Sequence, residues 1–245
     1  MLEMLVTSSF WVDVLKIIMI DILLSGDNAV VIALACRNLP PAQRQKGILF
    51  GMAGAVGLRI VLTFFAVSLL SLPYLKLVGA MLLIWIGIKL ILPEDEHDEN
   101  SIKADARLIG AIKTIIIADF VMSLDNVLGV AAAAKGNVPL LVFGLLISIP
   151  LIAWSSQLVL KLIDRFPYII YAGGALLGYV AGEMLVAEAL FAPLLEARHY
   201  LHWLVPAGCA VLVLVTGQWL AMRKVAASEV VNLVDGQSVM PGKQD

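Results

Sequence analysis

Charged residues and cysteines are scarce in this sequence. Only 15% of its 245 residues are charged, whereas soluble domains carry about 25%. This composition excludes an ordinary soluble globular domain. The two cysteines, Cys36 and Cys209, are far apart, so neither a disulfide framework nor a thiolate metal site is indicated. No long basic tract is present either, and we therefore expect no nucleic-acid partner.

Long apolar runs take the place of the missing charges. The chain is 61% hydrophobic, and its mean hydropathy is +0.95. Its apolar runs are continuous, and a helix of about 20 apolar residues crosses the hydrocarbon core of a membrane. We therefore predict an all-α fold, a polytopic membrane helical bundle with about seven transmembrane helices. The predicted spans are residues 10–35, 47–70, 74–92, 108–134, 140–162, 168–190 and 201–222.

The basic residues predict the orientation of the chain, because positively charged short loops stay in the cytoplasm. The first apolar run is expected to stay in the mature protein, since only Glu3 and no basic residue precedes it. We expect a bacterial-type cytoplasmic (inner) membrane protein with its amino terminus outside and its carboxyl terminus in the cytoplasm. The cytoplasmic side then carries Arg37, Arg44, Lys46, Lys89, Lys103, Arg107, Lys113, Lys161, Arg165, Arg223 and Lys224, and the other side carries Lys16, Lys76, Lys135 and Arg198.

A polar motif occurs twice within the apolar runs. DILLSGDN begins at Asp21 and DFVMSLDN begins at Asp119, and the matched positions are 98 residues apart throughout. Five matched polar positions indicate an internal repeat. Each half contains three predicted spans, so the second half enters from the opposite face, as in the inverted repeats of many secondary transporters. The matched pairs are Asp21 and Asp119, Ser25 and Ser123, Asp27 and Asp125, Asn28 and Asn126, and Arg37 and Lys135.

The repeat divides the chain into five parts. Residues 1–92 are predicted to form the first three-helix repeat and residues 108–190 the second, with an acidic cytoplasmic loop at 93–107 between them. The seventh transmembrane helix is expected within residues 191–222, where it packs against the bundle. Residues 223–245 are expected to form a polar cytoplasmic tail.

The carboxylates of the repeated motif lie near the middle of predicted spans, where a charge costs about 2.5–3.5 kcal/mol to insert. Two copies brought together would surround one cavity with oxygen atoms, which suit Mn²⁺, Ca²⁺ or Mg²⁺. Zinc and copper are poorer candidates, because no histidine or cysteine lies near either motif. Hydrogen bonding between helices would not by itself require duplicated carboxylates. The predicted metal ligands are Asp21, Asp27, Asn28, Asp119, Asp125 and Asn126.

Four further residues are candidates for accessory roles. Ser25 and Ser123 either complete the site or join helices by hydrogen bonds. Arg59 either neutralises an aspartate while the site is empty or forms a structural ion pair, and Glu183 is a candidate accessory ligand or proton relay. Gly26 suggests local unwinding of the first motif, which would free backbone carbonyls as ligands. Clustered carboxylates away from water resist ionisation, so metal entry is expected to expel protons.

The motifs DxxxSGDN and DxxxSLDN, one in each half, resemble those of the TerC family of integral membrane proteins, in particular its short YjbE-type members. The resemblance covers the chain through the seventh predicted span. It implies export of Mn²⁺ and relatedness to LysE-type exporters. It also implies that the four aspartates of the motifs bind the metal, with Asn28 and Asn126 beside them. The two copies differ within the motif where Gly26 of the first corresponds to Leu124 of the second.

Three functions remain as hypotheses. The leading one is a transporter, not an enzyme, that exports divalent cations, most of all Mn²⁺, through an Asp- and Asn-lined midplane site in exchange for protons. A membrane partner for metallation or assembly of exported proteins would need the same site. An intramembrane aspartyl protease is the third, although such enzymes carry a GxGD stretch and this chain reads SGDN and SLDN. The expected partners are the metal ion and the lipid bilayer, with no cofactor beyond the transported cation, and the oligomeric state stays open.

Overall fold

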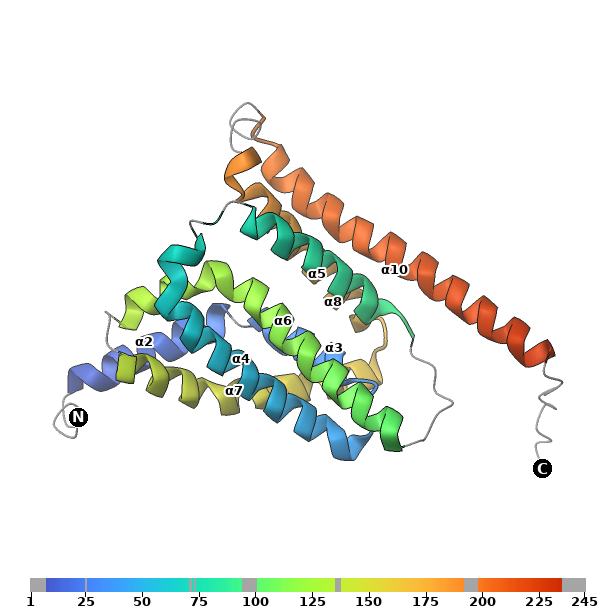
Figure 1. Ribbon diagram of the computed structural model, residues 1–245, viewed down its shortest axis with the longest axis horizontal. Coiled ribbons are helices and arrows are strands. Elements are labelled where there is room, and N and C mark those ends of the chain that lie inside the picture. Colours follow the sequence, from blue (N-terminus) through green and yellow to red (C-terminus); the bar gives the residue numbers. More distant parts are fainter. Residues whose placement is uncertain are drawn as a thin grey trace.

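Helices make up all the regular structure in the described part of the chain. The computed structural model describes residues 8–24, 26–70, 72, 74–93, 101–134, 138–191 and 198–234. Within these ranges there are eight α-helices, one 3-10 helix and no strand, which confirms the all-α prediction. The helices (Figure 1) are α2 (Ser8–Leu24), α3 (Gly26–Cys36), α4 (Pro41–Leu70), α5 (Leu75–Ile91), α6 (Ser101–Ala134), α7 (Val138–Arg165), α8 (Ile169–Val186), η1 (Ala189–Phe191) and α10 (Leu201–Val234).

The helices follow the predicted spans, with the largest differences at three places. The first predicted span corresponds to two helices, α2 and α3, on either side of Ser25. Ser25 lies outside the described residues, so unwinding beside Gly26 stays a prediction. Helix α6 begins at Ser101, inside the predicted acidic loop, and α10 continues to Val234, beyond the predicted end of the span. A helix can continue past the hydrocarbon core because its internal hydrogen bonds satisfy the backbone in water as well as in lipid.

Within the described residues, four segments are long and apolar enough to cross a membrane. They coincide with four of the seven predicted spans, and the other three predicted spans fall on α2 with α3, on α5 and on α6. The structure therefore supports a membrane helical bundle, while seven crossings and an inverted repeat stay predictions. The four segments are Pro41–Phe65, Val142–Arg165, Ile169–Val186 and Leu201–Val225.

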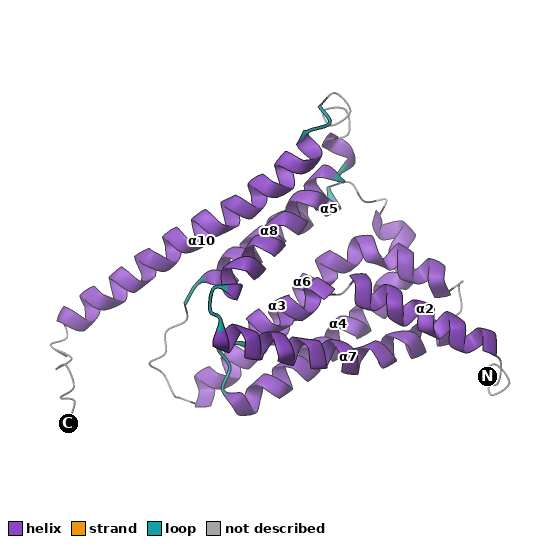
Figure 2. Ribbon diagram, turned by 180° about the vertical axis from the view of Figure 1, so that it is seen from behind, coloured by secondary structure: helices purple, strands orange, loops and turns teal. Residues whose placement is uncertain are grey.

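The helices pack in pairs drawn from the two halves of the sequence. Helix α4 lies along α6, α2 and α3 lie along α7, α5 lies along α8, and α10 packs against α8 and α5. Figures 1 and 2 show α5, α8 and α10 on one side of the molecule and the other long helices on the other side. The largest core of buried side chains joins the two groups through α3, α5, α6 and α8. It includes Leu34, Leu83, Ile115 and Leu177.

Large apolar side chains also cover the outside of the bundle. Phe64, Phe65, Trp154 and Trp203 are each more than half exposed. A helix that is apolar both toward its neighbours and away from them is typical of a membrane span, since lipid replaces water on the outer face. The outer surface of α4, α7 and α10 is therefore suited to contact with lipid.

Two glycines bring α8 and α10 into close contact. A Cβ atom at Gly182 would lie 2.3 Å from the Cα of Pro206, and one at Gly178 would lie 2.6 Å from the carbonyl oxygen of Cys209. Both clashes are with backbone atoms, which cannot rotate away as a side chain can. Small residues at such contacts are a common means of helix association in membranes. The close approach of α10 to the bundle therefore depends on these glycines.

Gly182→Ala is expected to lower the free energy of unfolding by about 1–3 kcal/mol, the usual cost of overpacking. The added methyl group forces α10 away from α8. The measurement is the midpoint of thermal unfolding of the purified protein in detergent. Gly208→Ala on α10 is the matched control, because nothing lies within 4 Å of its Cβ position. Equal midpoints for the two variants would contradict the close contact between α8 and α10.

Candidate functional site

Arg59 lies at the centre of a buried polar cluster. It belongs to α4 and is only 3% exposed. Its Nη1 donates to Asp21 of α2, and its Nη2 donates to Asp119 of α6 with an N···O distance of 2.5 Å. Its Nε donates to the Oγ of Ser123 at 3.0 Å. Arg59 therefore joins three helices and pairs with an aspartate from each copy of the repeated motif.

The second motif contributes two neighbouring side chains on one face of α6. Asp119 and Ser123 are four residues apart, so they lie one helical turn from each other. The Ser123 hydroxyl donates to Oδ2 of Asp119 at 3.2 Å while it accepts from Arg59. Both side chains are buried. Ser123 therefore belongs to the cluster and helps to orient the Asp119 carboxylate.

The first motif contributes two side chains at the start of α3. Nδ2 of Asn28 donates to Oδ1 of Asp119 at 2.9 Å, and the side-chain oxygen of Asn28 is buried with no hydrogen-bond partner among the described residues. Asp27 is half-buried in the first turn, where its Oδ1 accepts from the backbone N–H of Asn28 at 3.0 Å. Backbone N–H groups at a helix N-terminus favour a carboxylate. A buried amide oxygen is costly without a donor or a cation, so Asn28 is well suited to be a metal ligand.

Among the described residues, the cluster holds more acidic than basic side chains. Asp21, Asp27 and Asp119 are accompanied by the single guanidinium of Arg59, which gives these four groups a formal charge of −2 when all are ionised. Each buried ion loses several kcal/mol of hydration, and pairing with one cation offsets only part of that loss. A divalent cation would supply the missing positive charge, and the remaining groups are oxygen ligands of the kind that hard cations prefer.

Arg59 also stands between the carboxylates of the two motifs. Across the described ranges, no three acidic, histidine or cysteine side chains converge closely enough to hold a metal ion. At the cluster the guanidinium binds Asp21 with one nitrogen and Asp119 with another. The structure therefore presents an arginine-paired arrangement. A metal ion that bound Asp21 and Asp119 together would have to displace Arg59 from at least one of them.

The structure also places two further predicted site residues. Glu183 is exposed on α8, and Asn126 is half-buried on α6, one turn beyond Ser123. Ser25 and the side chain of Asp125 lie outside the described residues, so their roles stay predictions. The predicted residues that the structure brings together are Asp21, Asn28, Arg59, Asp119 and Ser123.

Sequence reasoning missed two features of the buried polar groups. It treated Arg59 as the partner of one aspartate, whereas the guanidinium joins one aspartate from each motif. It also passed over Glu188, which follows α8 and is only 8% exposed. Glu188 stands near the end of a predicted span, where polar side chains usually reach water, so its position alone gave no sign of burial.

Comparison with known proteins places the chain in a family. Residues 6–225 match the model of the integral membrane protein TerC family. The uncharacterized membrane protein YjbE of Bacillus subtilis is 45% identical over 179 residues, which are 73% of this chain and 81% of that protein. A UPF0053 protein of Haemophilus influenzae is 26% identical over 208 residues, 78% of this chain and 87% of that protein. No solved structure matches the chain significantly. The chain therefore belongs to the TerC family of integral membrane proteins.

Proposed function

We propose that this protein is a transporter, not an enzyme, that exports divalent cations from the cytoplasm, Mn²⁺ most of all, in exchange for protons. One observation carries the proposal: the two motif copies meet in one buried cluster, Asp21 and Asn28 from the first and Asp119 and Ser123 from the second. A structural cluster would not need aspartates from both copies of the motif, and the three described aspartates outnumber the one described arginine. Membership of a family of integral membrane proteins is compatible with transport.

The ligand set supports a hard or intermediate cation. The described donors are carboxylates and the buried amide oxygen of Asn28, all of them oxygen atoms. Such sites favour Mn²⁺, Mg²⁺ and Ca²⁺ over zinc and copper. We propose that Asp125 and Asn126 complete the shell from the second motif. The choice of Mn²⁺ among these ions rests on the resemblance of the two motifs to those of the TerC family.

Arg59 is proposed to be the internal counter-ion of the metal-free site. Its guanidinium neutralises part of the carboxylate charge and bonds to both Asp21 and Asp119. A divalent cation that binds there brings two positive charges, so the guanidinium has to leave at least one carboxylate. Protons and the metal compete for the same carboxylate oxygens, and this competition is the proposed basis of exchange.

The helix packing supports an inverted repeat. In an inverted repeat, α4 corresponds to α7, and α2 with α3 corresponds to α6. The contact of α4 with α6 should then have a counterpart between α7 and the pair α2 and α3, and both contacts are present. We propose that residues 1–92 and 108–190 are these halves, with seven crossings in total and α10 as the additional helix. One half would move against the other and expose the site to each side in turn. The amino terminus would lie outside the inner membrane and the carboxyl terminus in the cytoplasm.

The geometry gives less support to a protease. The two carboxylates of a protease dyad share a proton directly, whereas Asp21 and Asp119 are both bound by the guanidinium of Arg59. A metallation partner would use the same cluster as a transporter. Transport by the purified protein alone would separate these two functions.

The test is cation uptake by the purified protein in liposomes, with Mn²⁺, Ca²⁺, Mg²⁺ and Zn²⁺ offered in turn. We expect saturable Mn²⁺ uptake and movement of protons in the opposite direction, followed with a pH-sensitive dye inside the vesicles. Uptake of the cation without proton movement would contradict the proposed exchange for protons. Folded protein that moves none of the four cations would overturn the proposed transport.

Asn28→Leu is expected to raise the Mn²⁺ concentration for half-maximal uptake by about tenfold or more. The substitution keeps the size of the side chain but removes the buried oxygen and the hydrogen bond to Asp119. Gln45→Leu is the matched control, since it also replaces a side-chain amide with leucine, at an exposed position of α4. An unchanged half-maximal concentration in Asn28→Leu would show that this oxygen does not bind the cation.

A further inference from the structure

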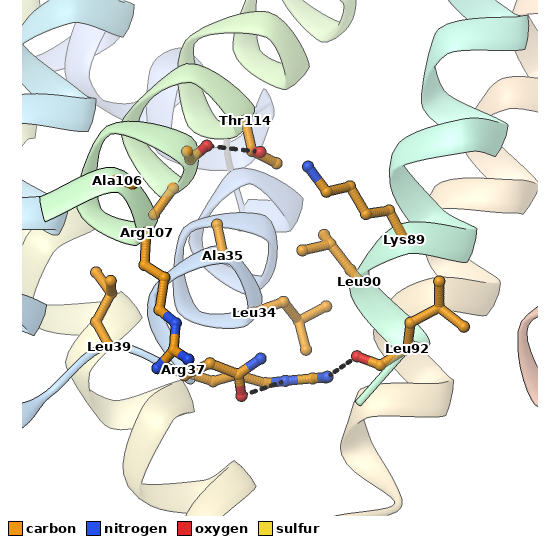
Figure 3. Close-up of a pocket in the computed structure, with 13 residues that line it drawn as sticks. Leu34, Ala35, Arg37, Leu39, Lys89, Leu90, Leu92, Ala106, Arg107 and Thr114 are labelled. Carbon is orange, nitrogen blue, oxygen red and sulfur yellow. Dashed lines mark hydrogen bonds between the residues drawn. The ribbon is translucent and has the colours of Figure 1, made fainter. Parts of the chain in front are cut away.

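A pocket of about 400 Å³ opens between α3, α5 and α6, apart from the buried cluster. It is formed by the carboxyl ends of α3 and α5 and by the amino-terminal part of α6, and Figure 3 shows the side chains that line it. Because α5 packs with α8 and α10, the pocket stands where the two helix groups of the bundle meet. A ligand in this pocket would contact both groups.

Each of the three chain segments that line the pocket contributes one basic side chain. They are Arg37 just after α3, Lys89 of α5 and Arg107 of α6, and none of the described lining residues is acidic. Arg37 is held in place by hydrogen bonds to the carbonyl oxygen of Leu92 at 3.0 Å and to Oδ1 of Asn38 at 3.2 Å. Figure 3 shows Arg107 extending toward Arg37, and Lys89 extending toward Thr114. The pocket therefore presents several cationic donors to one small volume.

The rest of the wall is mostly apolar, with the side chains of Asn38 and Thr114 as further polar groups. Leucine and alanine side chains separate the three basic residues, so the pocket offers hydrophobic contact beside its positive charge. Guanidinium and ammonium groups are the usual protein partners of phosphate, through hydrogen bonds and charge. This combination fits a phosphate group attached to an apolar body better than it fits free phosphate. The apolar lining includes Leu34, Ala35, Leu39, Leu90 and Leu92.

An exposed apolar stripe on α5 leads away from the pocket. Val78, Met81 and Trp85 are 56–58% exposed, and their spacing of three and four residues places them on the same face as Lys89. The ammonium nitrogen of Lys89 lies 5.3 Å from the centre of the Trp85 ring. A row of apolar side chains that ends in a cation matches an acyl chain that ends in a charged head group.

We propose that this pocket binds the phosphate head group of an anionic phospholipid, with its acyl chains along the stripe formed by Val78, Met81 and Trp85. Basic pockets between membrane helices are suited to such head groups. The bound lipid would join α5 to α3 and α6, and would so hold the two helix groups together. Lipid binding is measured without transport, so this proposal and the proposed export stand or fall separately.

The experiment is native mass spectrometry of the purified, delipidated protein with phosphatidylglycerol or phosphatidylcholine added in detergent. We expect phosphatidylglycerol to be retained at least about tenfold more strongly. Lys89→Gln and Arg107→Gln should each weaken its retention by about fivefold, in line with the contribution of one basic residue at an anionic membrane surface. Lys89 is exposed, so its substitution is not expected to disturb folding.

Lys113→Gln is the matched control, because Lys113 is an exposed lysine of α6 that does not line the pocket. Phosphatidylglycerol retention in Lys113→Gln should equal that of the wild type. If Lys113→Gln lost as much phosphatidylglycerol retention as Lys89→Gln, the effect would come from general surface charge, and the proposed lipid site would be overturned. Equal retention of both lipids by the wild type would also overturn it. Full competition by inorganic phosphate at matched concentration would assign the pocket to a soluble phosphate compound instead of a lipid.

Discussion

Proteoliposomes that contain Asp119→Asn are expected to lose Mn²⁺ uptake by at least about 100-fold, the upper end of what substitutions around a metal site cost. Asp119 accepts hydrogen bonds from Arg59, Asn28 and Ser123, so every described part of the cluster is connected through it. The substitution keeps the shape of the side chain and removes the charge that a divalent cation needs. The measurement is the initial rate of radioactive Mn²⁺ uptake at equal protein content.

The matched control for this loss is Asp164→Asn. Asp164 is an exposed carboxylate of α7 that pairs with Arg44 at 3.1 Å, so the same chemical change is made at an ion pair outside the cluster. We expect this variant to transport at the rate of the wild type, because exposed ion pairs contribute little to stability. A similar loss of uptake in both variants would point to a general dependence on surface ion pairs.

A triple variant separates loss of the site from loss of the fold. Asp119→Asn alone removes one acceptor of the buried guanidinium of Arg59, and breaking a buried ion pair costs about 3–5 kcal/mol. Asp21→Asn, Arg59→Gln and Asp119→Asn together remove every charge of the two ion pairs, so thermal stability should recover at least in part while transport stays absent. Wild-type uptake by the triple variant would contradict a ligand role for Asp21 and Asp119.

Replacement of Arg59, the internal counter-ion of the cluster, is expected to make the stability of the protein depend on bound metal. In Arg59→Gln, Asp21 and Asp119 lose their common donor, and the unfolding free energy of the metal-free protein should fall by about 3–5 kcal/mol. Mn²⁺ should restore most of this loss, since a ligand that binds only the folded state stabilises it by mass action. The measurement is the midpoint of thermal unfolding in chelator and in Mn²⁺. The wild type should gain less from Mn²⁺, because the metal has to displace the guanidinium first.

Arg44→Gln is the control for this experiment. Arg44 is also a paired arginine, but its partners are Asp164 and the backbone carbonyls of Leu39 and Arg37. Its substitution is expected to destabilise the protein to the same extent with and without Mn²⁺. If Mn²⁺ failed to rescue Arg59→Gln as well, Arg59 would be a structural ion pair and the cluster would lose its support as a cation site.

The sequence predicted best the features that depend on local composition. Continuous apolar runs predicted an all-helical chain, and four long apolar helices coincide with predicted spans. A backbone surrounded by lipid has to satisfy its hydrogen bonds within each segment, so length and hydropathy are enough to indicate a helix. The helix ends were harder to predict. Ser101 and Val234 lie in polar stretches, where hydropathy carries no signal for the end of a helix.

Spacing within the repeated motif identified most of the cluster. Asp21, Asn28 and Asp119 were predicted as metal ligands because carboxylates duplicated within apolar runs are costly. The double pairing of Arg59 was not predictable in the same way, since the second half of the chain has no matching basic residue near the middle of a span. The burial of Glu188 was likewise invisible, because exposure near the end of a span depends on the neighbouring helices.

The amino-acid sequence by itself determined the class of the protein, the duplication of its polar motif and the chemical type of its candidate ligands, because composition and spacing are properties of the chain alone. Tertiary structure decided how these parts meet. Packing of α4 along α6, and of α2 and α3 along α7, brings residues from three helices to the guanidinium of Arg59. Packing of α5 beside α3 and α6 forms the basic pocket. Side chains far apart in the chain share a site only when their helices pack together, and no local pattern records that contact.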